Sequence, residues 1–198
     1  RTRDHELVVF HDHNLLRMCQ VDRELSDFTL RELRSLRLKG SDESIPTLAE
    51  VLSLVHGQVP LLIEIKTASD VMAIARSVDA LLRQYSGPYM IESFDARALL
   101  WFRMHHRQVR RGQLAYGIPR NGPYPRTLLN RLLSTLLTDI LSRPDFIAFD
   151  VRTSSAISLR FLRLFRPWMV AWTVKTQKEI DDHRKDFDLF IFESFPAR

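Results

Sequence analysis

The run PLLIEIK, residues 60–66, has the pattern that decides the fold class, because an unbroken apolar stretch ends in a carboxylate and an ammonium group. Similar short apolar runs occur at 6–10, 88–94, 112–117, 145–151, 169–174 and 188–194. Longer segments with helical spacing of apolar residues lie between most of these runs. Continuous apolar strands that alternate with helices predict a parallel sheet that is buried on both faces.

Capping signals predict where several helices begin. Ser26 or Asp27 is a suitable N-cap for the helix that follows it. Thr47, with Glu50 three residues later, forms a capping box for the next helix. We also expect helices at 69–85, 95–106, 155–165 and 176–186.

Two architectures fit this alternation, an open doubly wound sheet and a closed barrel. An open nucleotide-binding sheet should carry a glycine-rich phosphate loop after an early strand, and the sequence has no such loop and only six glycines. Polar residues instead stand at or just beyond the ends of the predicted strands: His11, Glu64, Ser93, Asp150, Thr173 and Glu193. Because barrels build active sites from such strand ends, the sequence predicts a (β/α)8 TIM-type barrel.

The number of predicted strands tests this assignment. The runs that begin at 60, 88, 112, 145, 169 and 188 give six parallel strands. The run at 6–10 follows a predicted tight turn at Asp4-His5, and we expect it to be the second arm of a hairpin. We therefore expect residues 1–198 to form a single barrel domain that lacks about two N-terminal strands of the eight.

Composition and charge narrow the choice of partners. The net charge of +5 and the pI near 9.7 favour anionic partners. The densest basic stretch, 103–111, has no interleaved aromatic pattern, so we expect a solvated helix face and no nucleic-acid partner.

With one cysteine, Cys19, and no membrane-spanning run, we expect a cytoplasmic protein. The apolar segment 127–141 predicts barrel packing, with a lid, a dimer contact or a membrane surface as alternatives, and the oligomeric state stays open.

Three residues could carry chemistry. Glu64 and Lys66 are two apart on a predicted strand, so both side chains point to one face. They form either a salt bridge or a half-site in which Glu64 ligates a hard cation and Lys66 receives a phosphate oxygen. His11 is either a structural histidine or a general acid or base, and we expect Asp12 to orient a neighbour or brace the loop.

Several motifs together resemble the glycerophosphodiester phosphodiesterase family. The resemblance begins with TRDHELVVFHD at 2–12 and covers essentially the whole chain. It continues in the family's order with NLLRM, LSDFTLREL, IPTLAEVLSLV, LLIEIK at 61–66, IESF at 91–94 and AWTVKT at 171–176. Each motif is weak alone, and the seven in order are specific.

The resemblance implies an enzyme that hydrolyses glycerophosphodiesters to sn-glycerol 3-phosphate and an alcohol, using one divalent cation, Mg²⁺ or Ca²⁺. It implies that His11 is a catalytic histidine, that Glu64 is a metal ligand and that Lys66 contacts the phosphate. Phe94 and Trp172 would contact the apolar surface of the substrate. The implied reaction is an in-line displacement at phosphorus with histidine acid/base catalysis.

The sequence also departs from the family pattern. Three parts of the family pattern are missing: the opening His-Arg-Gly strand, the Glu-Asn pair and the Glu-x-Asp strand that follows them. In the family they supply a partner histidine, a phosphate-binding arginine and two metal carboxylates, and by register the Glu-x-Asp strand should end a few residues before Arg1. Lys175 replaces an asparagine, and Glu193-Ser194 replaces Thr-Asp. We expect this chain by itself to be inactive, as part of a longer enzyme. The alternatives are a truncated, non-catalytic barrel that binds phospho-ligands or scaffolds a partner, and a barrel similar to sphingomyelinase D or phosphatidylinositol-specific phospholipase C.

Overall fold

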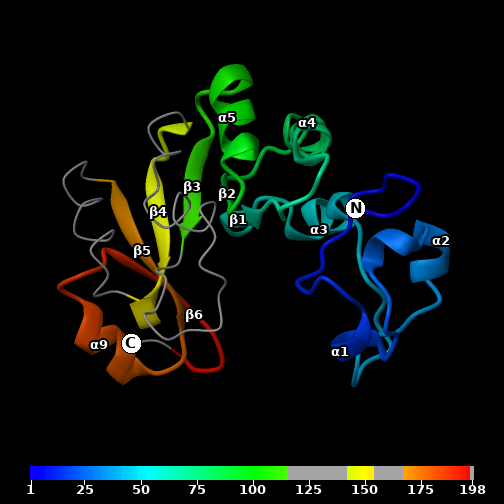
Figure 1. The fold of residues 1–198 in the computed structure, drawn as a ribbon, viewed down its shortest axis with the longest axis horizontal. Coiled ribbons are helices and arrows are strands. Elements are labelled where there is room, and N and C mark those ends of the chain that lie inside the picture. Colours follow the sequence, from blue (N-terminus) through cyan, green and yellow to red (C-terminus); the bar gives the residue numbers. More distant parts are fainter. Residues whose placement is uncertain (116–141, 154–166, 197–198) are drawn as a thin grey trace. The chain divides into compact units, whose positions relative to one another are not determined.

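The computed structural model describes residues 1–115, 142–153 and 167–196, and its main feature is a six-stranded sheet (Figure 1). The strands lie side by side in chain order: β1 Leu61–Glu64, β2 Tyr89–Ser93, β3 Arg110–Ala115, β4 Phe146–Asp150, β5 Trp168–Val174 and β6 Leu189–Phe192. Each pairing from β2 to β6 is parallel. The six predicted parallel strands are thereby confirmed.

Helices fill most of the described intervals between strands. Between strands lie α4 Val71–Leu82, α5 Ala96–His105, η2 Val151–Thr153 and α9 Gln177–His183. Four further helices precede β1: α1 Leu16–Cys19, η1 Leu25–Asp27, α2 Leu30–Leu33 and α3 Leu48–Val55. The predicted helices at 69–85, 95–106 and 176–186 are confirmed with shorter bounds. The predicted helix at 155–165 and the apolar segment 127–141 lie outside the described residues. Among the helices that are described, none is both long and apolar enough to cross a membrane.

The chain divides into two compact units. The first comprises Arg1–Leu61 and Ala73–Pro88, and the second comprises Leu62–Met72 and Tyr89–Arg198. In the first unit, the buried residues Leu15, Leu25, Leu33 and Ile45 form a core. The expectation of a single domain over 1–198 stays a prediction.

The predicted strand at 6–10 is wrong. Val8 forms only an isolated antiparallel bridge with Thr47, and Val9 is 44% exposed. The apolar run is held instead by single backbone hydrogen bonds, one of them from Val9 N to the Pro46 carbonyl at 2.9 Å. The expected tight turn does occur, since His5 N donates to the Thr2 carbonyl at 3.0 Å and His5 has a φ of 72°.

The predicted N-cap of α2 is also corrected, from Ser26 or Asp27 to Thr29. The Thr29 side chain accepts from Glu32 N, and the Glu32 carboxylate accepts from Thr29 N at 2.7 Å, which completes a capping box. Asp27 belongs to the preceding turn η1. Either residue type can cap a helix, and here the reciprocal Glu32 contact favours Thr29.

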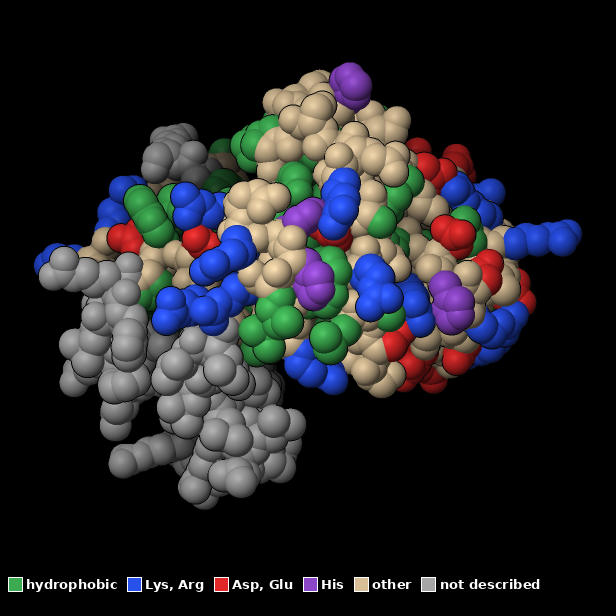
Figure 2. Space-filling model, turned by 90° about the horizontal axis from the view of Figure 1, so that it is seen from above, with side chains coloured by type: hydrophobic (Ala, Val, Ile, Leu, Met, Phe, Trp, Pro, Cys, Tyr) green, Lys and Arg blue, Asp and Glu red, His purple; other side chains and the backbone are tan. Residues whose placement is uncertain are grey.

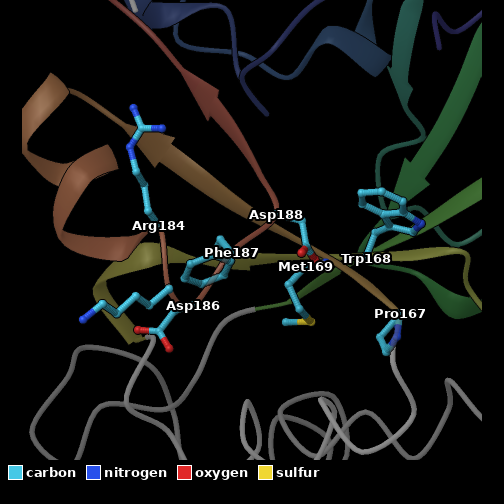
Figure 3. Close-up of a pocket in the computed structure, with 8 residues that line it drawn as sticks. Pro167, Trp168, Met169, Arg184, Asp186, Phe187 and Asp188 are labelled. Carbon is cyan, nitrogen blue, oxygen red and sulfur yellow. Dashed lines mark hydrogen bonds between the residues drawn. The ribbon is translucent and has the colours of Figure 1, made fainter. Parts of the chain in front are cut away.

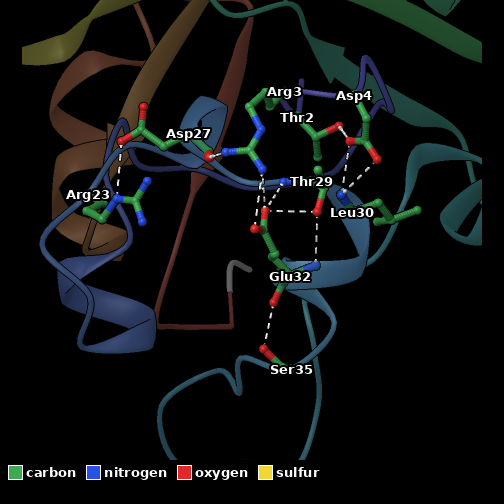
Figure 4. A network of polar contacts seen from close by, with 9 residues as sticks. All are labelled: Thr2, Arg3, Asp4, Arg23, Asp27, Thr29, Leu30, Glu32 and Ser35. Atoms are coloured by element: carbon green, nitrogen blue, oxygen red, sulfur yellow. Dashed lines mark hydrogen bonds and ion pairs between the residues drawn. The ribbon is translucent and has the colours of Figure 1, made fainter.

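Polar contacts fasten the chain's first residues to this cap (Figure 4). Arg3 donates to the Asp27 carbonyl at 2.7 Å and to the Glu32 carboxylate at 3.1 Å. Asp4 accepts from Leu30 N at 3.0 Å. At α3 the predicted Thr47–Glu50 capping box is confirmed.

The sheet of the second unit has two apolar faces, because successive side chains of a strand point to opposite sides. One face packs against Ile180 of α9 and includes Ala115, Ile147, Phe149, Met169 and Ala171. The other, which we call the Phe146 face, has Leu114, Phe146, Ala148 and Val170 at its centre. Met90, Phe94, Trp172 and Ile191 pack against that centre. The Phe146 face therefore carries two of the predicted site residues.

Candidate functional site

Glu64 and Lys66 lie at the carboxyl end of β1, where the sequence predicted them. Lys66 Nζ donates to Glu64 Oε2 at 2.7 Å, and both side chains are only partly exposed. The salt bridge that the spacing allowed is thus present. The pair still leaves acceptor positions on the Glu64 carboxylate and donors on the Lys66 ammonium, so a cation and a phosphate oxygen could each find a partner here.

Phe94 and Trp172 form an aromatic contact on the Phe146 face. Their ring centroids are 5.6 Å apart in an edge-to-face arrangement. Trp172 Nε1 donates to the Ala148 carbonyl at 2.8 Å, and this bond orients the indole across β4. Because Phe94 follows β2 and Trp172 lies near the end of β5, both rings stand toward the carboxyl ends of their strands.

Glu92, a residue that the sequence analysis missed, belongs to the same region. It lies on β2 two residues before Phe94, so the two side chains share a face, and it is only 7% exposed. Burial, and secondly the nearby Glu64 carboxylate, raise the pKa of Glu92 to about 7, against an opposing effect of Lys66. In the sequence, Glu92 could have been recognised as an acidic residue inside an otherwise apolar predicted strand.

His11 lies in the first unit, on a loop, and its side chain is 82% exposed. His11 Nδ1 contacts Asp12 Oδ1 at 2.8 Å, so a donating Nδ1–H would leave Nε2 available for proton transfer. Arg17 donates two hydrogen bonds to the same carboxylate, from Nε at 2.7 Å and from Nη2 at 2.9 Å. The hydrogen bonds from Arg17, and secondly from His11, lower the pKa of Asp12 to about 2.

The remaining polar strand ends serve local structure. Ser93 Oγ donates to the Ile65 carbonyl at 2.6 Å and ties β2 to β1. Asp150 pairs with the exposed Arg152 two residues later. Glu193 lies 3.4 Å from Lys175, which stands where the family has asparagine.

The prediction that the basic stretch 103–111 forms one solvated helix face is wrong. The helix α5 ends at His105, and Arg111 is buried in β3, where it donates to the Val109 carbonyl at 2.6 Å. Burial lowers the pKa of Arg111. On the face shown in Figure 2, Lys and Arg side chains are interspersed with acidic and apolar ones.

One pocket of about 370 Å³ lies away from these residues (Figure 3). Its lining is Pro167, Trp168, Met169, Arg184, Lys185, Asp186, Phe187 and Asp188. Trp168 is the first residue of β5, so the pocket opens at the amino end of the strand. Barrel enzymes place chemistry at the carboxyl ends, and the pocket is therefore not the predicted site.

The described residues include no group of three or more His, Cys, Asp or Glu side chains that could hold a metal ion. Two carboxylates from neighbouring strands, Glu64 and Glu92, are nevertheless close enough to interact electrostatically. Glu92 Oε2 is buried and has no hydrogen-bond partner in the described part of the chain. Carboxylate oxygens are of the ligand type that Mg²⁺ and Ca²⁺ prefer.

Residues 1–128 match the model of the glycerophosphoryl diester phosphodiesterase family. The chain belongs to this family. A Bacillus subtilis (strain 168) protein, YhdW, provisionally assigned as a glycerophosphodiester phosphodiesterase, is 34% identical over 110 residues. The match covers 52% of this chain and 45% of YhdW, so it spans less than half of that relative's length.

Solved structures of the family share the fold. A phosphodiesterase from Oleispira antarctica, in complex with the product sn-glycerol-3-phosphate, has a TM-score of 0.76 at 18% identity. The glycerophosphodiester phosphodiesterase of Thermotoga maritima has a TM-score of 0.69 at 22% identity. Both comparisons cover 96% of this chain and 77% of the other chain. The parallel sheet is therefore the sheet of this family's fold.

Proposed function

We propose that the protein containing this chain hydrolyses glycerophosphodiesters to sn-glycerol 3-phosphate and an alcohol, and that the sheet is part of a (β/α)8 barrel. One observation carries the proposal: four predicted site residues lie at or just beyond the ends of strands in one sheet. Glu64 and Lys66 form a contact of 2.7 Å at the end of β1, and Phe94 and Trp172 form an aromatic pair toward the ends of β2 and β5. Family membership and the product complex of the Oleispira protein support the substrate class.

The chain's own side chains would divide the work. Lys66 would bind a non-bridging phosphate oxygen as a point charge. Phe94 and Trp172 would contact the apolar part of the substrate and exclude water. His11, held by Asp12 through Nδ1, would exchange a proton at Nε2. A divalent cation bound through Glu64 would polarise the phosphoryl oxygens and lower the pKa of the attacking hydroxyl.

The test is the assay of the natural protein, with the 198-residue chain beside it, on glycerophosphocholine and Mg²⁺ or Ca²⁺. Release of glycerol 3-phosphate is followed with a coupled dehydrogenase. We expect Glu64→Gln to lower kcat/KM by about 100-fold or more, because the carboxylate would hold the cation beside the reacting phosphate. Asp182→Asn, on the exposed polar helix α9, is the matched control.

A phospho-ligand-binding or scaffold function is the second candidate, and it is favoured by the Glu64–Lys66 ion pair, which satisfies both charges without a ligand. In that case Glu64→Gln in the natural protein would leave function unchanged. An inositol phosphate or a ceramide phosphate as product would instead assign a different phosphodiesterase reaction. Either result would overturn the proposed hydrolysis.

A further inference from the structure

The register of β1 against β2 places two carboxylates opposite each other. Ile65 N donates to the Glu92 carbonyl at 2.8 Å. In a parallel pair, an N–H bonds the carbonyl that precedes the residue opposite, so Ile65 lies opposite Ser93. Glu64 is therefore opposite Glu92. Because residues opposite each other on neighbouring strands project to the same side, both carboxylates lie on one face.

One oxygen of the buried Glu92 carboxylate lacks a hydrogen-bond partner among the residues that the structure describes. The residue is 7% exposed, and Oε2 is the unpartnered oxygen in the described ranges. On β3 the residue opposite Glu92 is Gly112, which offers no side chain. The space above Gly112 is filled by the ring of Phe146, since a Cβ at Gly112 would lie 2.0 Å from that ring. An unsatisfied buried oxygen is costly and calls for a ligand.

Charge points to the kind of ligand. Lys66 supplies one positive charge and donates to Glu64 Oε2. Glu64 and Glu92 together can carry two negative charges, and two adjacent carboxylates repel each other in a buried site. A hard cation between the strands would satisfy the orphaned oxygen of Glu92 and offset the repulsion. Carboxylate oxygens are the ligands that such cations prefer.

We propose that Glu92 is a second ligand, beside Glu64, of the divalent cation in the proposed function. The proposal rests on that function for the cation itself and adds a ligand from the neighbouring strand. It makes β1 and β2 together, rather than β1 alone, the part of this sheet that binds the metal.

The test is a direct binding measurement that does not depend on turnover. The full chain is freed of metal with a chelator, and calorimetry with Mg²⁺ and Ca²⁺ is compared with the electron paramagnetic resonance of bound Mn²⁺. Glu92→Gln keeps the side-chain volume and removes the charge. We expect it to weaken cation affinity by about tenfold or more, as Glu64→Gln should, because ligand charge sets the affinity of such sites. Asp182→Asn should bind cation like the unaltered chain.

Two further measurements keep the outcomes separate. Glu92→Asp retains a carboxylate and should recover part of the affinity that Glu92→Gln loses, which a general loss of folding would not allow. If Glu64→Gln weakens binding and Glu92→Gln does not, the role of Glu92 is overturned while the proposed function stands. If the unaltered chain binds no divalent cation, the role of Glu92 is overturned as well. Glycerol 3-phosphate release by the natural protein then decides the proposed function separately.

Discussion

At the scale of single residues, the buried carboxyl of Glu92 should make the stability of the protein depend on pH. Its pKa is raised from 4.5 to about 7, mainly by burial. The folded protein therefore binds this proton more tightly than the unfolded chain, so the contribution to stability is complete below pH 4.5 and is lost as pH rises through about 7. A shift of this size corresponds to about 3 kcal/mol at most.

The prediction is that the free energy of unfolding without divalent cations falls between about pH 5 and about pH 8, and that Glu92→Gln removes most of this fall. Urea denaturation in the presence of a chelator measures both. Asp182→Asn, on the exposed helix α9, should leave the pH dependence unchanged. An unaltered pH dependence in Glu92→Gln would contradict the assignment of the titration to Glu92.

Asp12 is expected to act as a positioning residue for His11. Since the pKa of Asp12 is lowered to about 2, mainly by Arg17, its carboxylate stays ionised at ordinary working pH. It can then accept from His11 Nδ1 and hold one tautomer of the ring. We predict that Asp12→Asn lowers kcat of the natural protein by about tenfold or more and changes KM little, because the ring is less well oriented for proton transfer.

The decisive readout for Asp12 is spectroscopic. The ¹⁵N shifts of the His11 ring should report a dominant Nδ1–H tautomer in the unaltered chain and a mixture in Asp12→Asn. The exposed Asp22→Asn should change neither the shifts nor kcat. If the His11 tautomer is the same in Asp12→Asn and in the unaltered chain, Asp12 does not position His11. Its role is then limited to binding Arg17 and holding the loop.

At the scale of elements, the packing of β3 against β4 depends on a glycine, Gly112. Gly112 lies opposite Phe146 in the register, and a Cβ at Gly112 would be 2.0 Å from the Phe146 ring. We predict that Gly112→Ala lowers the free energy of unfolding by about 1–3 kcal/mol through overpacking. Phe146→Leu in the same chain should recover part of that loss, as chemical denaturation of the two variants would show. Additive losses would mean that the ring does not fill this space.

Periodicity and capping signals predicted the elements well where the determinants are local. Six strands and the α3 cap at Thr47 follow from side chains within a few residues of each other. The run at 6–10 failed because an apolar stretch does not show whether a neighbouring strand is available to pair with it. Thr29 was missed as the cap of α2 because Asp27 and Thr29 cap equally well, and only the Glu32 contact separates them.

The site was predictable only within single strands. The period of two placed Glu64 and Lys66 on one face, and the structure brings them into contact. Glu92 was missed because its nearness to Glu64 depends on the register between two strands, which neither strand's sequence contains. The catalytic role of His11 stays a prediction that rests on the family resemblance.

At the scale of the whole molecule, net charge should affect how substrate is captured. The chain carries a net charge of +5, and its proposed substrates are phosphodiesters. A net positive protein raises the local concentration of anionic ligands, and salt screens this attraction over about 10 Å at 0.1 M ionic strength. Glycerophosphoglycerol carries a net negative charge, whereas glycerophosphocholine is zwitterionic, so the two substrates should respond differently to salt.

We predict that raising ionic strength lowers kcat/KM of the natural protein for glycerophosphoglycerol by roughly two- to threefold, and lowers it much less for glycerophosphocholine. Measuring kcat at saturating substrate is the control, because screening acts on capture and should leave the bound-state chemistry unchanged. If both substrates lose kcat/KM equally, salt acts on Lys66 at the phosphate itself, since both substrates share that group. The comparison therefore separates the field of the whole chain from the single charge that lies beside Glu64.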